Sequence, residues 1–539
     1  EVHEPLGLRF RWGLSGCDRY GLVRRAVIDE LAGEPVDIRY LDGLHQIIPP
    51  GVDQELYSRF SYLALAYMRH ERLEDVPLAL YTLNTTVTDR PEPSESLRAT
   101  VAWSVGHPHP QVLLDDTGLG SFRRGEQLED QAEARGRMGA YLALDRVRLD
   151  GHGTHDWYTV ADTWLDHAAV LELRESLRSP TTLRSDLERA VAADAEGLDV
   201  RVAAADGIEV SADEATTANH FANVLYNIMR GGTFEHGYEV PGADVGSYLR
   251  DQSPATLARH RAWVEGLPEQ LPLSELQVAA AATDDPQLRR LLGAYLPLTF
   301  SRRHGDPSRP WNRFSIRVRD AEGQPVFGYE GNWRDIFQNW EALGQSYPAF
   351  LPHFVAVFLN ASTDDGYNPY RITRTGIDWE VFDPSDPWSH IGYWGDHQIV
   401  YLHRLLEAWE RFEPGRIRAR LDERSFASAD VPYRIGGFAE MARDPRHTIT
   451  FDEGRDEAAL SDVGELGADA KLVRDGDGRV RLVTLAEKLL IPLLVKLTNL
   501  VPGSGIWLNT QRPEWNDANN ALAGWGVSMV TLNAIAGYL

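Results

Sequence analysis

Two carboxylates near the end of the chain are spaced around an indole ring and an amide, in the run Arg512-Pro513-Glu514-Trp515-Asn516-Asp517. A carboxylic acid can protonate a glycosidic oxygen, and a flat aromatic ring can stack on the apolar face of a pyranose. We therefore predict that Asp517 is the general acid of a sugar-cleaving site. Glu514 is the second catalytic candidate, either as the base that activates water or as the acid itself. The neighbouring side chains are predicted to bind the substrate: Gln511, Arg512, Trp515 and Asn516.

Both carboxylates also fit a structural role. They lie where the pattern predicts the start of the final helix, over residues 517–539, and a carboxylate there can satisfy unpaired backbone N–H groups. Asn519 and Asn520, however, are poor helix formers for a first turn. They fit better as groups that bind sugar hydroxyls.

A second motif of the same kind is Gly331-Asn332-Trp333-Arg334-Asp335. A carboxylate here can accept two adjacent sugar hydroxyls while the arginine holds it in place. The three predicted substrate-binding residues of this motif are Trp333, Arg334 and Asp335. The alternative, a structural ion pair between Arg334 and Asp335, explains the motif equally well. The apolar positions of the helix that begins here are predicted to face inward: Ile336, Phe337 and Trp340.

A long connection rich in aromatic and polar residues follows a helix predicted at 348–359 and ends at a helix predicted at 396–409. Its length of roughly 30 residues exceeds what packing usually needs, and long ordered loops tend to carry function. The candidate substrate-binding residues in and around it are Tyr370, Arg371, Trp394, Asp396 and His397.

Residues 302–311 concentrate positive charge in an otherwise acidic chain. Arg303 is therefore a candidate for binding phosphate. The alternative is that these arginines are intramolecular partners for the many acids.

Composition limits the class of function. The chain has 539 residues, 43% of them hydrophobic and 25% charged, with a formal net charge of −26. Nucleic acid and anionic membrane surfaces both require a basic footprint, so neither is an expected partner. Cys17 is the only cysteine, which excludes an internal disulfide and a thiolate metal cluster. We expect no metal and no cofactor, a cytoplasmic location, and a chain that belongs to a longer or processed product because it begins with Glu1.

The periodicity changes along the chain and predicts three parts. Short strands separated by turns dominate the first ~200 residues, which predicts a large β-sandwich over 1–205. Helical spacing then predicts a linker over 206–295. Long helices are predicted over 333–343, 348–359, 396–409, 485–497 and 517–539. With the polar loops between them they predict a helical toroid over 296–539, with an insertion at about 412–483 where the helical pattern breaks.

The two motifs resemble those of the cellobiose-phosphorylase-like group of inverting glycoside phosphorylases and their hydrolase relatives. In that group an aromatic-Arg-Asp motif binds the sugar at the cleavage subsite, as Trp333-Arg334-Asp335 would here. The aspartate of its Trp-Asn-Asp motif is the general acid, as Asp517 would be. The resemblance implies an N-terminal β-sandwich, a helical linker and a C-terminal (α/α)6-type toroid. An incomplete toroid in this chain is the alternative.

Three functions remain open on these grounds. The leading one is a glycoside phosphorylase that cleaves an oligosaccharide or glycoside with inversion and uses inorganic phosphate as co-substrate. The second is an inverting hydrolase of the trehalase or amyloglucosidase kind, and the third is a non-catalytic carbohydrate-binding protein. A homodimer is compatible with each.

Overall fold

The computed structural model describes residues 1–88, 90–91, 94–230, 233–234, 236–298, 320, 326–368, 371–379, 381, 385, 398–509 and 522–539. The chain divides into two compact units, Glu1–Asp199 and Val200–Leu539. Within the described ranges, no helix is long and apolar enough to cross a membrane.

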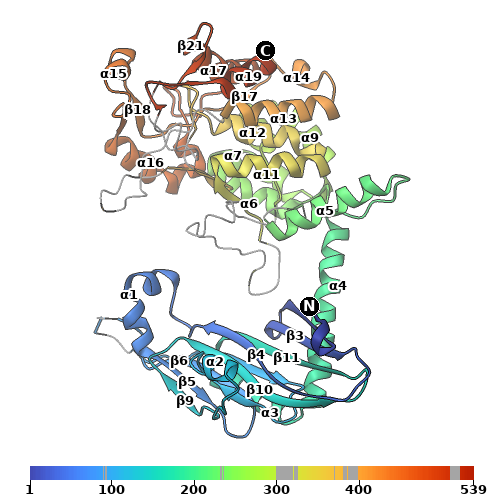
Figure 1. Cartoon of the computed structure of the whole chain (residues 1–539). Helices are drawn as coiled ribbons and strands as arrows, with labels where there is room; N and C mark the ends of the chain where they lie inside the picture. Colours follow the sequence, from blue (N-terminus) through green and yellow to red (C-terminus); the bar gives the residue numbers. More distant parts are fainter. Residues whose placement is uncertain are drawn as a thin grey trace. The chain divides into compact units, whose positions relative to one another are not determined.

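Two antiparallel sheets form most of the first unit (Figure 1). The larger sheet has eight strands, in the order β1 (Val2–His3), β2 (Leu8–Cys17), β3 (Gly21–Glu30), β11 (Thr154–Leu165), β7 (Ala99–Val105), β6 (Leu78–Leu83), β5 (Met68–Arg72) and β9 (Glu133–Arg135). The smaller sheet has the order β4 (Val36–Ile47), β10 (Gly139–Leu149) and β8 (Gln111–Leu113). The strand-rich character predicted for this part is confirmed.

The two sheets pack face to face around a shared apolar core, the arrangement of a β-sandwich. Tyr81 of the larger sheet and Tyr141 of the smaller one are both fully buried in this core. At the other end of the interface, Tyr40 of β4 stacks on Trp157 of β11 with ring centroids 4.6 Å apart. The alternation of apolar and polar residues along the strands supplies these inward-facing side chains.

Two helices cover the outer face of the larger sheet: α3 (His167–Leu177) and α4 (Pro180–Ala204). Leu183 and Leu187 of α4 pack against Trp103 and Val160 of the sheet. The strands predicted to dominate the first ~200 residues therefore do not extend into this stretch, whose helices were not predicted. Residues 167–204 are rich in Ala, Leu, Arg and Glu, which have high helix propensity.

The second unit is mainly helical and is built around one large apolar core. Its longer helices are α5 (Glu214–Arg230), α6 (Gly242–Gln252), α9 (Leu273–Ala282), α10 (Pro286–Gly293), α11 (Trp333–Ser346), α12 (Leu351–Asn360), α13 (Gln398–Phe412), α16 (Glu453–Leu466), α17 (Leu485–Leu497) and α19 (Met529–Tyr538). Most side chains of α12 are buried, and the helix packs against α10, α11 and α13 (Figure 1). A helix that is apolar on nearly every face is a central one.

Most of the predicted helices of this unit are confirmed. The helix predicted at 333–343 is α11, and those predicted at 348–359, 396–409 and 485–497 are α12, α13 and α17. Short strands β17 (Arg424–Phe426), β18 (Tyr433–Ile435), β19 (Ile449–Phe451) and β20 (Val483–Thr484) lie between α13 and α17. That region holds the predicted insertion, whose bounds stay a prediction.

The single helix predicted over 517–539 is wrong. Gly524 has a φ of +82°, and a Cβ at this position would lie 2.0 Å from Pro445. The backbone then forms β23 (Val527–Ser528), and α19 begins only at Met529. The Gly-Trp-Gly run at 524–526 permits the left-handed turn that breaks the helix.

Candidate functional site

The aromatic-Arg-Asp motif lies at the start of α11, where a strand leads directly into the helix. Strand β14 covers Glu330–Asn332, and α11 begins at Trp333. A Cβ on Gly331 would come within 2.9 Å of the Ile336 side chain, so the tight strand-to-helix turn needs glycine. The structure describes only the backbone of Trp333, Arg334 and Asp335. The apolar residues that follow are buried as predicted: Ile336, Phe337 and Trp340.

Arg371 is a second predicted site residue, and the fold places it beside this motif. Strand β15 (Arg371–Thr373) pairs with β14, and Arg371 lies opposite Asn332 in the register. Its guanidinium bridges two carboxylates, Glu330 at 2.7 Å and Asp378 at 2.6 Å. Residues 332 and 371, far apart in the sequence, thus meet at one edge of a three-stranded sheet completed by β16 (Gly376–Asp378).

A line of alternating charges continues from Arg371 along this sheet. Lys471 donates to Asp378 at 2.8 Å, and its ammonium group lies 4.9 Å from the centroid of the Trp379 ring. The Trp379 indole N–H donates to Asp456 at 2.6 Å. These contacts hold the sheet edge next to α11 in one arrangement, which suits a surface that orients a polar ligand.

The carboxylate of Asp378 is held in its charged form. Burial would raise its pKa, but the hydrogen bonds from Lys471 and Arg371 outweigh this and keep the pKa below its ordinary value. The same direction holds for every described carboxylate whose pKa is shifted. A general acid needs a raised pKa, so none of these shifted groups is suited to that role.

A buried amide lies just before this sheet. Asn368 is completely buried, and both its side-chain oxygen and its side-chain nitrogen lack a hydrogen-bond partner among the described residues. Leaving such a group unpaired costs about 1–3 kcal/mol. A buried amide of this kind is commonly satisfied by an internal water molecule.

Most of the other predicted site residues lie outside the described residues. They are Arg303, Tyr370, Trp394, Asp396, His397, Gln511, Arg512, Glu514, Trp515, Asn516 and Asp517. Of the predicted site residues, the structure therefore brings together only Arg371 and the backbone at 333–335. Whether Asp517 is close to Asp335 stays a prediction.

The described residues that flank two of these segments do lie together. The Leu508 N–H donates to the Gly526 carbonyl at 3.0 Å, and the Gly524 N–H donates to the Leu508 carbonyl at 2.6 Å. The two ends of the segment that contains Asp517 are therefore joined. Ile506, just before that segment, shares an apolar cluster with Ile399, two residues after His397.

A buried ion pair connects the sheet edge to a distant part of the chain. Arg374, in the turn after β15, pairs with Asp244 of α6 at 2.7 Å, and Tyr295 donates to the same carboxylate at 2.5 Å. Arg374 also donates to the Phe327 carbonyl at 2.9 Å. This connection fixes the β15–β16 turn against residues 242–295.

Sequence reasoning missed several of these groups. Glu330 contacts Arg371, while Lys471 and Asp244 contact its neighbours Asp378 and Arg374. Each of the three lies in a segment with no local signal of its own. The Lys471–Asp378 and Arg374–Asp244 pairs join residues 93 and 130 positions apart. Asn368 was not selected as a site residue, although it belongs to the polar run before Arg371 that the sequence analysis identified.

Lys488 is a buried lysine whose hydrogen bonds join α17 to neighbouring segments of this unit. It is fully buried on α17 and donates to the Ser362 carbonyl and the Ser428 hydroxyl, each at 3.0 Å. Burial lowers its pKa to about 7, against the opposing effect of Asp364. The Ser428 hydroxyl beside it is also buried, so a substrate cannot reach this pair directly.

Lys488→Met should remove a pH dependence of stability. In the unfolded chain the lysine pKa is about 10.4, so between pH ~7 and ~10 the unfolded state binds more protons than the folded state. The free energy of unfolding of the unchanged protein should therefore rise with pH relative to the variant, by about 1–3 kcal/mol from pH 7 to pH 9. Urea unfolding at both pH values measures this. A difference between the two proteins that is the same at pH 7 and pH 9 would contradict the assignment.

Comparison with known proteins identifies one segment. Residues 234–297 match the family model described as Glycoside hydrolase family 149 insertion domain 1. A search of curated proteins found no match to the chain. The matched segment contains α6, α9 and α10 and includes both Asp244 and Tyr295. It links this part of the chain with carbohydrate-active enzymes.

A search of solved structures returned a protein from the human microbiome that is named as a kojibiose phosphorylase. It is 10% identical, with a TM-score of 0.23, and the match covers 76% of this chain and 52% of the other. This chain thus spans about half of that protein's length. A TM-score this low does not establish a shared fold.

Proposed function

We propose that this chain is part of a carbohydrate-active enzyme that cleaves a glycosidic bond with inversion, and that it is a glycoside phosphorylase. The observation that carries the proposal is the match of residues 234–297 to an insertion domain of a glycoside hydrolase family. The two motifs that end at Asp335 and Asp517 support it. We propose the same domain order as above: a sandwich over 1–205, a linker over 206–295 and an (α/α)6-type catalytic domain over 296–539.

The proposed reaction is a single displacement at the anomeric carbon. Asp517 gives its proton to the glycosidic oxygen as the bond between that oxygen and the anomeric carbon breaks. A phosphate oxygen forms the new bond from the opposite face, so the product is a sugar 1-phosphate of inverted configuration. Phosphate arrives as an anion and needs no protein base. Water would need one, and Glu514 is the candidate for that role.

The sheet edge beside α11 is the proposed wall of the sugar subsite. Asp335, in the first turn of α11, would accept sugar hydroxyls, and Arg371 lies one strand away, opposite Asn332. Glu330 and Asp378 fix the Arg371 guanidinium from two sides. Such fixed polar groups lower the cost of ordering a ligand.

Asp335→Ala should raise KM and lower kcat together. Hydrogen bonds to sugar hydroxyls strengthen in the transition state, so their loss affects both parameters. We expect kcat/KM to fall about 10- to 100-fold, the equivalent of one or two charge-assisted hydrogen bonds. Steady-state kinetics measure this, and the exposed Asp251→Ala serves as a control with the same change of charge. Unchanged kcat and KM in Asp335→Ala would remove this residue from the site.

The reaction itself is tested by product analysis. The protein is incubated with a panel of α- and β-linked disaccharides, with and without inorganic phosphate. Release of a sugar 1-phosphate that depends strictly on phosphate supports the proposal, and release of free sugars without phosphate identifies a hydrolase. Binding of oligosaccharide in calorimetry with no product after long incubation identifies a non-catalytic binding protein.

A further inference from the structure

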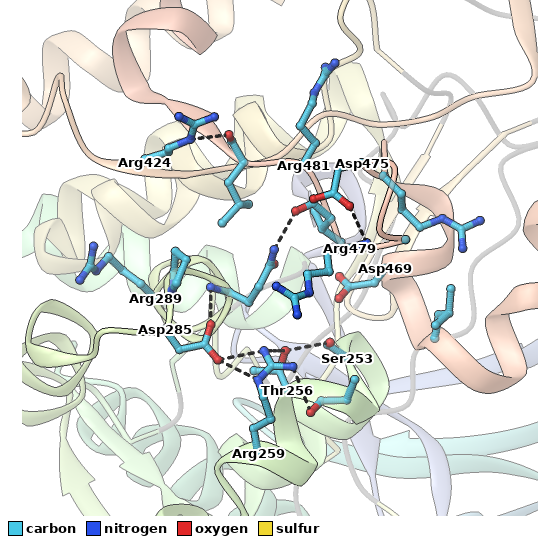
Figure 2. A pocket seen from close by; sticks show the side chains of 18 of the residues that line it. Ser253, Thr256, Arg259, Asp285, Arg289, Arg424, Asp469, Asp475, Arg479 and Arg481 are labelled. Carbon is cyan, nitrogen blue, oxygen red and sulfur yellow. Dashed lines mark hydrogen bonds and ion pairs between the residues drawn. The ribbon is translucent and has the colours of Figure 1, made fainter.

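A cavity of about 830 Å³ lies in the second unit (Figure 2). Its walls come from α7 (Pro254–Arg259), the start of α10, strand β17 and the hairpin at 474–482. None of the candidate residues at 333–335, 370–371, 394–397 or 511–517 is among its described lining residues. A volume of this size is typical of pockets that bind organic ligands, about 300–1,000 Å³.

The cavity is positively lined although the chain is strongly acidic. Six arginines and four aspartates line it, whereas the whole chain carries a net charge of −26. Three of the arginines are neutralised by carboxylates. Arg259 pairs with Asp285 and Arg474 pairs with Asp462, at 2.8 and 2.7 Å, and Arg481 pairs with Asp364.

The other three arginines form no ion pair with a carboxylate among the described residues, although Arg289 interacts with Glu423 at longer range. Arg289 donates to the Ala280 and Thr283 carbonyls at 3.2 and 2.5 Å, and Arg424 donates to the Leu482 carbonyl at 2.9 Å. Carbonyl oxygens position a guanidinium group but do not cancel its charge. Arg479 makes no side-chain hydrogen bond within the described part. Figure 2 shows these arginines coming from three separate parts of the wall.

The aspartates of the wall are mostly occupied by local contacts. Asp285 accepts from the Gln287 N–H at the start of α10 and pairs with Arg259 and His260. Asp469 pairs with Arg290 at 2.6 Å. The carboxylate of Asp475 accepts from two backbone N–H groups of its own hairpin, at 3.0 Å each. Among the described residues, the wall therefore keeps three arginines without an ion-pair partner against two such aspartates, Asp284 and Asp475, which leaves an excess of positive charge.

We propose that this cavity binds a phosphorylated organic molecule, such as a sugar phosphate. A phosphate monoester is a dianion with several acceptor oxygens. As a ligand it can accept hydrogen bonds from more guanidinium groups than a carboxylate can. The volume exceeds what inorganic phosphate alone needs, so an organic part fills the remainder. Part of the wall, residues 253–289, belongs to the segment that matches the glycoside hydrolase insertion domain.

Calorimetric titration of the full chain with glucose 6-phosphate, inorganic phosphate and glucose tests the proposal. The pocket variant is Arg424→Gln with Arg479→Gln, because both side chains are exposed and the fold should persist. The matched control is Arg416→Gln with Arg418→Gln, two exposed arginines of α14 (Arg416–Ala419) outside the cavity. Thermal melting confirms that both variants are folded.

We expect glucose 6-phosphate to bind the unchanged protein and the α14 control more tightly than inorganic phosphate does, and glucose not to bind. In the pocket variant the affinity should fall at least about tenfold, the effect of losing one charge-assisted hydrogen bond or more. Binding should persist in Asp335→Ala, which separates this cavity from the proposed sugar subsite. No binding to the unchanged protein, equal affinity in the pocket variant, or inorganic phosphate binding as tightly as the ester would overturn the proposal.

Discussion

Asp517→Asn is expected to lower kcat by about 10²- to 10⁴-fold, the usual contribution of a general acid. The amide has nearly the same shape as the carboxyl group but no proton to give to the leaving oxygen. Sugar binding and the fold should be largely preserved. Steady-state kinetics with the disaccharide that the unchanged protein cleaves measure the loss. A kcat close to that of the unchanged protein would show that Asp517 is not the general acid.

A substrate that needs no acid gives a sharper test of the same residue. The fluoride ion of a glycosyl fluoride, and the phenolate of an aryl glycoside made from an acidic phenol, leave the anomeric carbon without being protonated. The Asp517→Asn variant should therefore recover much of its lost rate on such substrates, whereas a variant with a merely distorted site should not. An equal loss on both kinds of substrate would assign Asp517 a structural role.

Glu514→Gln is the matched control for the same segment. If phosphate is the nucleophile, no protein base is required, so this variant should retain most of the activity. If water is the nucleophile and Glu514 activates it, the loss should be similar to that of Asp517→Asn. The pair of variants thus separates phosphorolysis from hydrolysis independently of product analysis.

Local structure in this chain could largely be predicted from the sequence. The start of α11 near Trp333 follows from the helical spacing of the apolar residues after it, and the bounds of α17 follow from one apolar run. These features depend on residues within a few turns of one another. The helices at 167–204 were not predicted, because strand patterns dominate the chain up to that point, although the composition of this stretch favours helices.

The connections around the candidate site could not be predicted in the same way. Arg371 was selected for its type and its position in a long loop, but nothing local indicates that it lies opposite Asn332. The partners of this region, Lys471 and Asp244, come from distant segments. Ion pairs over such separations depend on how helices and sheets pack, which periodicity does not encode.

The Asp244–Arg374 pair is expected to be among the most important single contacts for the stability of the second unit. Both side chains are nearly buried, at 8% and 10% exposure. Asp244 also accepts from Tyr295, so removal of the carboxylate leaves a buried cation and a buried hydroxyl without this partner. Breaking one side of a buried pair typically costs about 3–5 kcal/mol.

Asp244→Ala should therefore lower the free energy of unfolding by about 3–5 kcal/mol. Urea unfolding measures the loss, and hydrogen exchange locates it in peptides from α6 and from residues 371–378. The control is Asp251→Ala, an exposed aspartate on the same helix, for which we expect a change within about 0.5 kcal/mol. Equal stability of the two variants would show that the pair contributes little.

A second substitution separates the cost of the unpaired charge from the loss of packing. In the double variant Asp244→Ala with Arg374→Met, no buried cation remains, so part of the lost stability should return. The coupling energy from this double-mutant cycle should be at least about 1 kcal/mol. Additive effects would instead indicate that Arg374 is held mainly by the Phe327 carbonyl. Recovery of stability would establish the ion pair as the connection between the segment resembling the glycoside hydrolase insertion domain and the sheet that leads into α11.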